Sequence, residues 1–333
     1  MIKAYAANQA GGKLEPFEYD PGELGQDDVE VKVEYCGICH SDLSMLNNDW
    51  GITQFPFVPG HEVVGTISQV GSNVSSRKVG QRVGIGWHAG YCLSCKQCMQ
   101  GDHNLCRQAQ GIIIGRHGGF ADKVRVQAAS AIVLPDDLDV ESAGPLFCGG
   151  ITVFTPIHDY ELKPTGKVGV IGIGGLGHMA LGFLNKWGCE VTAFTSSEDK
   201  MQQALELGAH KTINSRDPEA IKAARGQFDL IISTVNVTLD WNLYISTLTT
   251  KGRLHFVGAV QEPLAITAGS LMNAQKSVSS SPVGSPATIA TMIEFAARHD
   301  IRPTVEVYPM EKVNEAMQHL ADGKARYRVV LKM

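Results

Sequence analysis

The stretch at residues 168–197 constrains the fold of this chain more than any other. A short apolar run at 168–171 leads directly into a glycine-rich turn, and apolar residues then recur at helical spacing as far as Trp187. Gly188 ends the expected helix, and a second apolar run follows at 190–194. This order predicts a βαβ unit whose first turn carries a G-x-G-x-x-G pattern.

The glycines of this turn suit the binding of a dinucleotide. Gly172 allows the tight turn, Gly174 lets backbone N–H groups approach a pyrophosphate, and Gly177 lets the helix pack close to the strand. Gly175 and Leu176 complete the turn, and the positive end of the helix dipole faces the anion. A purely structural turn is the alternative. A membrane span is excluded, because the apolar stretch has only 17 residues and contains six glycines.

Length and charge narrow the class of protein. A chain of 333 residues predicts two domains, and 44% hydrophobic with 19% charged residues is typical of a globular protein. The net charge is −5 and there is no basic block, so neither nucleic acid nor a membrane surface is expected as a partner. The N-terminal sequence has no signal-peptide pattern, which predicts a cytoplasmic protein. In that compartment eight cysteines indicate metal or redox chemistry more than disulfides.

Four cysteines lie within one 15-residue segment, at Cys92, Cys95, Cys98 and Cys106. Four thiolates at this spacing predict a closed tetrahedral zinc site with a structural role. A bacterial iron–sulfur run would place its fourth cysteine after three residues and a proline behind it, whereas here the gap is seven residues. Two disulfides are disfavoured by the reducing compartment.

Further metal-binding residue types are scattered along the first half of the chain. A C-x-x-C pattern ends at Cys39, and Asp42 follows it. His61 and Glu62 open an alternating strand, and Cys148 lies in a glycine-hinged apolar segment at 145–153. Taken alone, His61 is more often structural than a ligand, and Cys148 is more often an inert buried thiol. Considered together, these residues make a second metal site worth testing.

From residue 152 onward, strand and helix patterns alternate. A strand is expected near 211–213 and buried strands at 229–233 and 253–258, with helices before and between them. This alternation predicts a doubly wound parallel sheet. The chain closes with amphipathic helices at 288–299 and 313–320 and a strand at 327–332.

Several motifs in order resemble the zinc-dependent medium-chain alcohol dehydrogenases, in particular the cinnamyl-alcohol-dehydrogenase-like branch with its bacterial NADPH-dependent aldehyde reductases. They are GICHSD at 37–42, GHEVVG at 60–65, the four-cysteine segment, PLFCGGITV at 145–153, IGIGGLGH at 171–178 and KARYRVVL at 324–331. The resemblance covers essentially the whole chain. It implies an α/β protein with a GroES-like, mainly β catalytic domain at 1–151 and 288–333. A Rossmann coenzyme domain at 152–287 would be inserted between these segments.

The resemblance also implies roles for the scattered residues. Cys39, His61 and Cys148 would hold a catalytic zinc with an open fourth position, so that the chain would bind two zinc ions. Glu62 would be an alternative or neighbouring ligand, and Asp42 would orient the zinc histidine.

Two further residues take roles from the same resemblance. Ser41 would exchange a proton with the substrate oxygen, and a helix N-cap is its structural alternative. Many relatives carry a histidine three residues after this hydroxyl, where this chain has Ser44, so that the outer relay group stays open between water, Ser44 and Asp49. Arg328 resembles the arginine that contacts the coenzyme pyrophosphate, and a solvated arginine on an edge strand is the alternative.

The end of the second strand of the βαβ unit predicts NADP(H) rather than NAD(H). An NAD-specific fold places an acidic residue there, about 20 residues past the glycines, whereas this chain has Thr195, Ser196 and Ser197. These hydroxyls can donate to a 2′-phosphate, and Lys200 can supply the counter-charge. The two acidic residues between them fit the first turn of the next helix.

The function expected from all of this is reversible hydride transfer between NADPH and an aldehyde, with a primary alcohol as the partner. Trp50, Trp87, His88 and Ile113 are expected pocket walls, which suits aromatic or medium-chain aliphatic aldehydes. One alternative is a regulatory or structural member that binds zinc and NADP(H) without turnover. Another is a zinc-free quinone or enoyl reductase, which would lack the four-cysteine segment. A homodimer joined through an edge strand at 275–281 is also expected.

Overall fold

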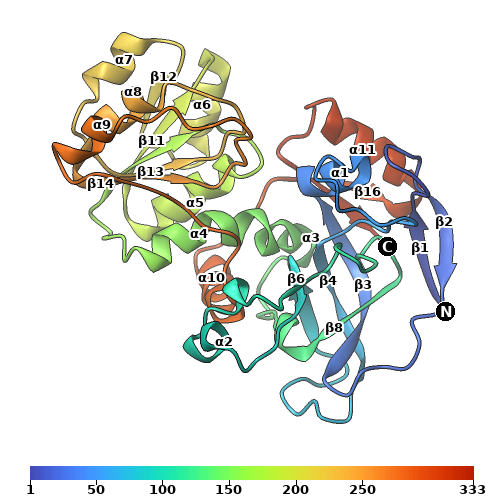
Figure 1. The fold of residues 1–333 in the computed structure, drawn as a ribbon. Helices are drawn as coiled ribbons and strands as arrows, with labels where there is room; N and C mark the ends of the chain where they lie inside the picture. The colour runs from blue at the N-terminus through green and yellow to red at the C-terminus, as the bar shows by residue number, and fades with distance from the viewer. The chain divides into compact units, whose positions relative to one another are not determined.

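The computed structural model describes residues 1–333, which form two compact units (Figure 1). The first unit comprises residues 1–151 together with 283–333, and the second comprises residues 152–282. The sequence places the second junction after residue 287, five residues later than the structure does. The first unit is therefore discontinuous in sequence, with the second unit inserted into it.

The first unit is built mainly on antiparallel strands, with β16 and β17 pairing in parallel. Its main sheet has the order β16-β17-β3-β4-β5-β9, and β8 also pairs with β3. Two small sheets, β1-β2 and β6-β7, accompany it. The strands are β1 (Ile2–Ala6), β2 (Glu15–Tyr19), β3 (Asp28–Ile38), β4 (Glu62–Val70), β5 (Arg82–Ile85), β6 (His88–Gly90), β7 (Gln110–Gly111), β8 (Lys123–Gln127), β9 (Ile132–Val133), β16 (Val305–Pro309) and β17 (Arg328–Lys332).

The long strand β3 organises this unit and leads to the site. Val29, Val31 and Val33 alternate along it and are buried, as the period-2 pattern predicts. Its last residue, Ile38, also lies in the core, and Cys39 follows at once. β17, β4 and β8 all pair with β3, so segments from both ends of the chain meet at this strand.

Short helices cover the first unit. The helix α11 packs against β3, β16 and β17, and α10 contacts β9. The α-helices are α1 (His40–Asn47), α2 (Lys96–Gln100), α3 (Val140–Ala143), α10 (Pro286–Arg298) and α11 (Val313–Ala321), while α4 (Gly149–Asp159) begins in this unit and ends in the second.

The second unit holds the parallel sheet that the sequence predicts. All five neighbouring pairs are parallel, in the order β12-β11-β10-β13-β14-β15. The connections reverse direction between β10 and β13, which is the switch point of a doubly wound sheet. The strands are β10 (Lys167–Ile171), β11 (Glu190–Thr195), β12 (Lys211–Asn214), β13 (Phe228–Ser233), β14 (Leu248–Phe256) and β15 (Ser277–Ser280).

Helices pack against this sheet and bury its apolar residues. The helices α5 and α6 contact β10, β11 and β12, while α8 packs on β14. A cluster of large side chains, including Trp241, Phe194 and Phe228, fills the space between α8 and the strands. The helices are α5 (Gly177–Trp187), α6 (Glu198–Glu206), α7 (Pro218–Ala223), α8 (Trp241–Ser246) and α9 (Ala268–Met272).

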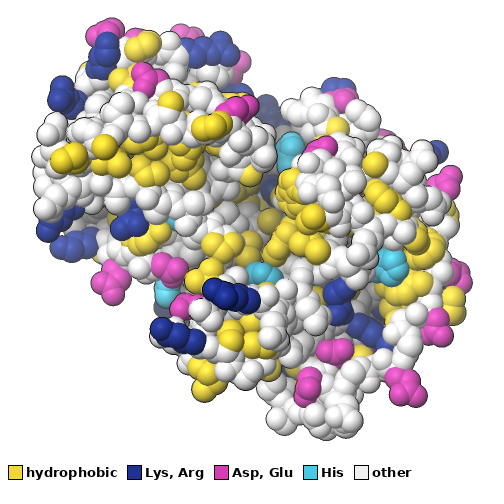
Figure 2. Space-filling view, viewed as in Figure 1, with side chains coloured by type: hydrophobic (Ala, Val, Ile, Leu, Met, Phe, Trp, Pro, Cys, Tyr) yellow, Lys and Arg dark blue, Asp and Glu magenta, His cyan; other side chains and the backbone are white.

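Both units carry mixed surface charge. Figure 2 shows basic and acidic side chains interspersed on the face in view, as the small net charge suggests. None of the helices has the length and apolar character that crossing a bilayer would require.

Candidate active site

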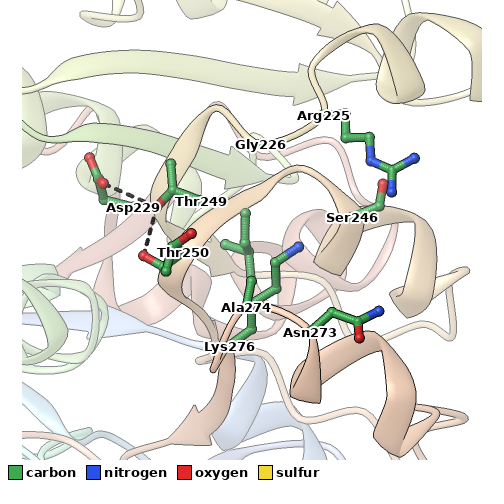
Figure 3. A pocket seen from close by; sticks show the side chains of 10 residues that line it. Arg225, Gly226, Asp229, Ser246, Thr249, Thr250, Asn273, Ala274 and Lys276 are labelled. Carbon is green, nitrogen blue, oxygen red and sulfur yellow. Dashed lines mark hydrogen bonds between the residues drawn. The ribbon is translucent and has the colours of Figure 1, made fainter.

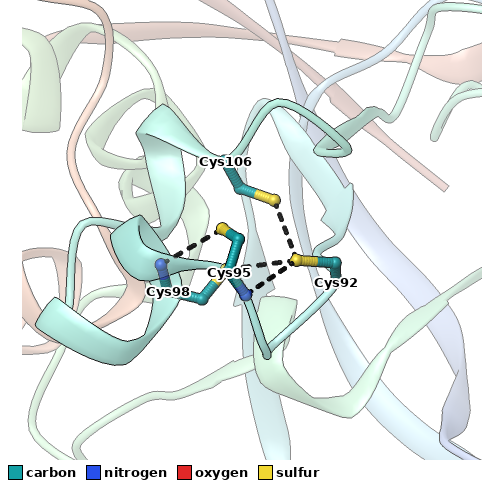
Figure 4. A group of neighbouring side chains, drawn as sticks. All are labelled: Cys92, Cys95, Cys98 and Cys106. Atoms are coloured by element: carbon teal, nitrogen blue, oxygen red, sulfur yellow. Dashed lines mark hydrogen bonds between the residues drawn. The ribbon is translucent and has the colours of Figure 1, made fainter.

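The four cysteines of the 92–106 segment converge on one point (Figure 4). The helix α2 carries Cys98, its N-cap is Cys95, and Cys92 and Cys106 come from the flanking turns. The sulfur of Cys92 lies 3.9 Å from that of Cys98 and 3.5 Å from that of Cys106. Four thiolates around zinc at about 2.3 Å would be about 3.8 Å apart, so the spacing suits a tetrahedral ion.

Backbone groups support thiolates in this loop. The amide of Cys95 donates to the sulfur of Cys92 at 3.3 Å, and the amide of Cys98 donates to the sulfur of Cys95 at 3.5 Å. Hydrogen bonds from the Ser94 and Cys95 amides lower the pKa of Cys92 to about 6. Because the thiolate is the zinc ligand, these amides favour metal binding by Cys92, whereas burial raises the pKa of Cys98.

A second cluster forms in the first unit where three segments meet. Cys39 is the N-cap of α1 at the end of β3, His61 and Glu62 stand at the start of β4, and Cys148 follows the 3₁₀ turn Gly144–Phe147. The sulfur of Cys39 lies 3.9 Å from that of Cys148, and Nε2 of His61 lies 3.2 Å from the same Cys148 sulfur. One ligand atom from each of the four residues lies within 4.8 Å of every other.

The carboxylate of Asp42 holds this cluster in place. Its Oδ1 lies 3.0 Å from Nδ1 of His61 and accepts the Gly60 amide at 2.8 Å. Its Oδ2 accepts the Cys39 amide at 2.9 Å. All of these groups are buried. Nδ1 of His61 is therefore engaged, which leaves Nε2 directed at the thiols, as a metal-binding imidazole requires.

The side chain of Glu62 is buried and pairs with Arg328. One guanidinium nitrogen of Arg328 bonds to Oε1 of Glu62, and both side chains are at least 95% buried. Oε2 of Glu62 makes no hydrogen bond. A buried carboxylate oxygen without a partner, beside two thiols and an imidazole, fits a cation at this point. A β-carbon at Gly37 would lie 2.0 Å from that oxygen, so only glycine leaves room for Glu62.

The ionisable groups of this cluster shift one another's pKa values. A hydrogen bond with Cys148, aided by Arg328 and His61, holds the pKa of Cys39 well below its usual range against the effect of burial. Burial opposes the charged form of His61, yet the Asp42 carboxylate raises the pKa of that imidazole. Burial raises the pKa of Glu62, and Arg328 partly offsets this effect.

The N-cap alternative for Ser41 is wrong. Cys39 is the N-cap of α1, and Asp42 at the third helical position closes the capping box, so Ser41 lies inside the first turn. Its Oγ lies 3.9 Å from the Cys39 sulfur, which leaves the hydroxyl beside the cluster.

Two aromatic side chains approach the cluster within the first unit. The ring of Trp87 lies edge-on to that of His61, with centroids 5.1 Å apart, and Trp50 packs on Trp87 at 6.1 Å. His88 packs instead on Tyr91. Ile113 is buried in the core of the unit.

The glycine-rich turn of the second unit has the shape that the pattern predicts. Gly172 has φ +84°, and the Thr234 hydroxyl donates to its carbonyl oxygen at 2.8 Å. A β-carbon at Gly177 would lie 2.0 Å from that carbonyl oxygen, so glycine is needed where α5 meets β10. A β-carbon at Gly174 would meet nothing within 4 Å, which leaves the space that a pyrophosphate would occupy.

The end of β11 carries hydroxyls and no carboxylate. Thr195 is buried, Ser196 is half-buried, and Ser197 is exposed as the N-cap of α6, where its Oγ accepts the Lys200 amide at 3.4 Å. The Lys200 side chain is exposed, and the two acidic residues occupy the first turn of α6. Arg328, expected at the pyrophosphate, is engaged by Glu62 within the first unit.

A shallow pocket of the second unit lies near the amino ends of the parallel strands, whereas the glycine-rich turn follows the carboxyl end of β10 (Figure 3). It is lined near the amino ends of β13 and β14 by residues that include Arg225, Thr249 and Lys276. The ammonium of Lys276 donates to the Ile245 carbonyl at 2.7 Å. The glycine-rich turn follows the carboxyl end of β10, so this pocket is separate from the expected coenzyme site.

Sequence reasoning missed two contributions to the metal cluster. Gly37 makes space for Glu62, and Arg328 neutralises it across a separation of 266 residues. The GICHSD motif contains Gly37, but nothing near that glycine indicates which side chain it faces. The pairing of β17 with β3 brings Arg328 to the cluster, and no sequence pattern near Arg328 predicts this pairing.

Comparisons with known proteins agree with these two sites. Residues 25–136 match the family model for the alcohol dehydrogenase GroES-like domain, and residues 175–298 match that for zinc-binding dehydrogenase. Aldehyde reductase AdhA of Synechocystis sp. is 61% identical over 331 residues, which span 99% of this chain and 98% of that protein.

Solved structures show the same fold. A cinnamyl alcohol dehydrogenase of Sorghum bicolor, SbCAD4, superposes with a TM-score of 0.94 at 36% identity, covering 99% of this chain and 97% of that one. The CAD of Helicobacter pylori, complexed with NADP(H), gives a TM-score of 0.91 at 28% identity, covering 100% and 98%. The predicted architecture, a GroES-like unit with a Rossmann unit, is thus confirmed. The chain belongs to the zinc-dependent medium-chain alcohol dehydrogenase family, as an oxidoreductase of the alcohol dehydrogenase and aldehyde reductase kind.

Proposed function

We propose that this protein is a zinc-dependent, NADP(H)-linked aldehyde reductase that binds two zinc ions per chain. Its substrates would be aromatic or medium-chain aliphatic aldehydes, with primary alcohols in reverse. The observation that carries the proposal is the cluster of Cys39, His61 and Cys148 beside the unpartnered oxygen of Glu62. Two thiolates and an imidazole are a known ligand set for catalytic zinc.

The residues of the first unit would bind the metal and orient the substrate. Zinc and the nicotinamide, when bound, supply a Lewis acid and a hydride. Asp42 fixes the orientation of the His61 ring and the position of the Cys39 backbone. Ser41, beside the cluster, would exchange a proton with the substrate oxygen. Trp87 and Trp50 would present an apolar wall to the carbon skeleton of the substrate.

The coenzyme preference is proposed from the end of β11. No carboxylate stands there to repel a 2′-phosphate, while Ser196, Ser197 and the exposed Lys200 can donate to it. A hydrogen bond to a charged group contributes about 1.5–3 kcal/mol, and about 1.4 kcal/mol is a tenfold change in affinity. Lys200→Ala should therefore weaken NADPH by about tenfold or more and barely change NADH.

Kinetics with both coenzymes test this proposal. NADPH consumption with benzaldehyde should be robust and should disappear with a zinc chelator. Ser196→Asp should reverse the coenzyme preference. Equal kcat/KM for NADH and NADPH in the unmodified protein would refute the NADP(H) assignment. Absence of turnover with a panel of aldehydes and alcohols would favour the regulatory alternative.

A further inference from the structure

The strand next to β11 ends beside the expected 2′-phosphate site, and a further cationic residue, Arg216, follows it. β12 lies at the edge of the sheet and pairs in parallel with β11, so that Asn214 stands opposite Thr195. The amide of Ser215 then donates to the carbonyl of Thr195 at 2.9 Å. Arg216 is the next residue. Like Ser196, it follows the carboxyl end of its strand, and the two strands are parallel neighbours.

The turn that carries Arg216 is held by its own hydrogen bonds. The Arg216 amide donates to Oδ1 of Asn214 at 2.9 Å, and the Asp217 amide donates to the Asn214 carbonyl at 3.1 Å. The Asp217 carboxylate caps α7 by accepting the Glu219 and Ala220 amides at 3.0 and 3.3 Å. The backbone of Arg216 is therefore fixed, and the neighbouring carboxylate is already engaged.

The Arg216 side chain is available to bind a ligand. It is exposed, and its guanidinium makes no ion pair or hydrogen bond within the chain. Parallel strands lie about 4.8 Å apart, and an arginine side chain extends further than that. Its planar donor fork suits the oxygens of a phosphate.

We propose that Arg216 is a coenzyme-specificity residue that binds the 2′-phosphate of NADP(H) from the side opposite Lys200. The hydroxyls of Ser196 and Ser197 would then lie between two cations, one from the first turn of α6 and one from the turn after β12. This inference rests on the proposed NADP(H) preference. It adds a determinant from a strand that the glycine-rich motif does not contain.

Direct binding to the zinc-loaded protein tests this role without relying on turnover. The probes are 2′,5′-ADP and 5′-AMP in calorimetric titrations, since both carry the adenosine but only the first carries a 2′-phosphate. Arg216→Gln should weaken 2′,5′-ADP by about tenfold and leave 5′-AMP within about twofold. Arg216→Lys should retain part of the affinity, because it keeps the charge but loses the fork.

The matched control is Arg225→Gln. Arg225 is also exposed on the second unit, but it lies near the amino ends of the parallel strands. Its substitution should therefore change the affinity for neither 2′,5′-ADP nor 5′-AMP. An unchanged melting temperature shows that each variant is folded.

The possible outcomes separate the inference from the function on which it rests. If the unmodified protein binds 2′,5′-ADP no more tightly than 5′-AMP, the NADP(H) preference itself fails. If that preference holds and Lys200→Ala abolishes it while Arg216→Gln does not change it, only the role of Arg216 is overturned. An equal loss of affinity for both probes in Arg216→Gln would also overturn it.

Discussion

At the scale of single residues, His255 connects β14 to the serine run at 279–281. The imidazole is fully buried in β14, and its Nδ1 and Nε2 lie 2.9 and 3.0 Å from the hydroxyls of Ser279 and Ser281. Ser279 lies on β15 and Ser281 comes directly after its last residue; side chains two apart in extended chain point to the same side, so one histidine can bond both. Tyr160 lies 3.4 Å from Nδ1, and the Arg253 guanidinium stacks on the Tyr160 ring.

This environment makes the stability of the second unit depend on pH. Burial, with a contribution from Arg253 that Asp159 partly offsets, lowers the pKa of His255 from 6.5 to about 4. The folded state therefore resists a proton that the unfolded chain accepts. The stabilisation is fully present above about pH 6.5 and is lost as the pH falls towards 4, by about 3 kcal/mol.

His255→Gln should flatten the pH dependence of unfolding in that window. Glutamine can both donate to and accept from the two serines, but it does not titrate. The measurement is the free energy of unfolding in denaturant between pH 7 and pH 4. Other histidines titrate equally in both proteins, so the difference between them reports His255. Parallel curves for the two proteins would contradict this account.

At the scale of elements, the two cysteine clusters differ in how they depend on the fold. The 92–106 loop brings its four sulfurs together over 15 residues, whereas the other cluster needs β3, β4 and the turn before α4. Binding a structural zinc contributes folding free energy directly. The strands that carry the other cluster already belong to the core of the first unit, so we expect its metal to contribute less to folding.

Substitutions in the four-cysteine loop should therefore affect mainly stability, and substitutions in the other cluster should affect mainly turnover. Cys95→Ser should lower the melting temperature markedly, because it removes a ligand from the closed site. Cys148→Ser should abolish most of the turnover with a much smaller change in melting temperature. Metal analysis should give two zinc ions in the unmodified protein and one in each variant. One zinc or none in the unmodified protein would contradict the two-site proposal.

At the scale of the whole molecule, the parallel sheet ends in two edges, β12 and β15. An exposed edge presents unpaired backbone groups that can pair with another chain. The edge strand expected at 275–281 corresponds to β15, which the structure places at Ser277–Ser280. We propose that two copies of this chain associate through β15.

Light scattering at micromolar concentration should give the mass of a dimer. Ser280→Lys introduces a charge on the exposed end of β15 and should shift the protein towards the monomer, because like charges would face each other across the contact. Thr212→Lys on β12 is the matched control and should leave the mass unchanged. A monomer mass for the unmodified protein would refute the proposal.

The sequence by itself was sufficient for features that depend on short spacings. The βαβ unit, the parallel sheet and the four-cysteine loop all follow from residues close together in the chain, because local geometry limits what such spacings can form. The family assignment, which the comparisons confirm, also rested on motifs read in order. His61 and Cys148 were ambiguous alone, and only the resemblance connected them.

The tertiary structure alone decided which distant groups meet. The pairing of β17 with β3 sets Arg328 on Glu62, and the pairing of β12 with β11 sets the turn that carries Arg216 next to the end of β11. It also made Cys39, rather than Ser41, the cap of α1. These contacts depend on strand order and register, which are determined by the packing of the whole core. The residues that flank each contact in the sequence therefore do not predict it.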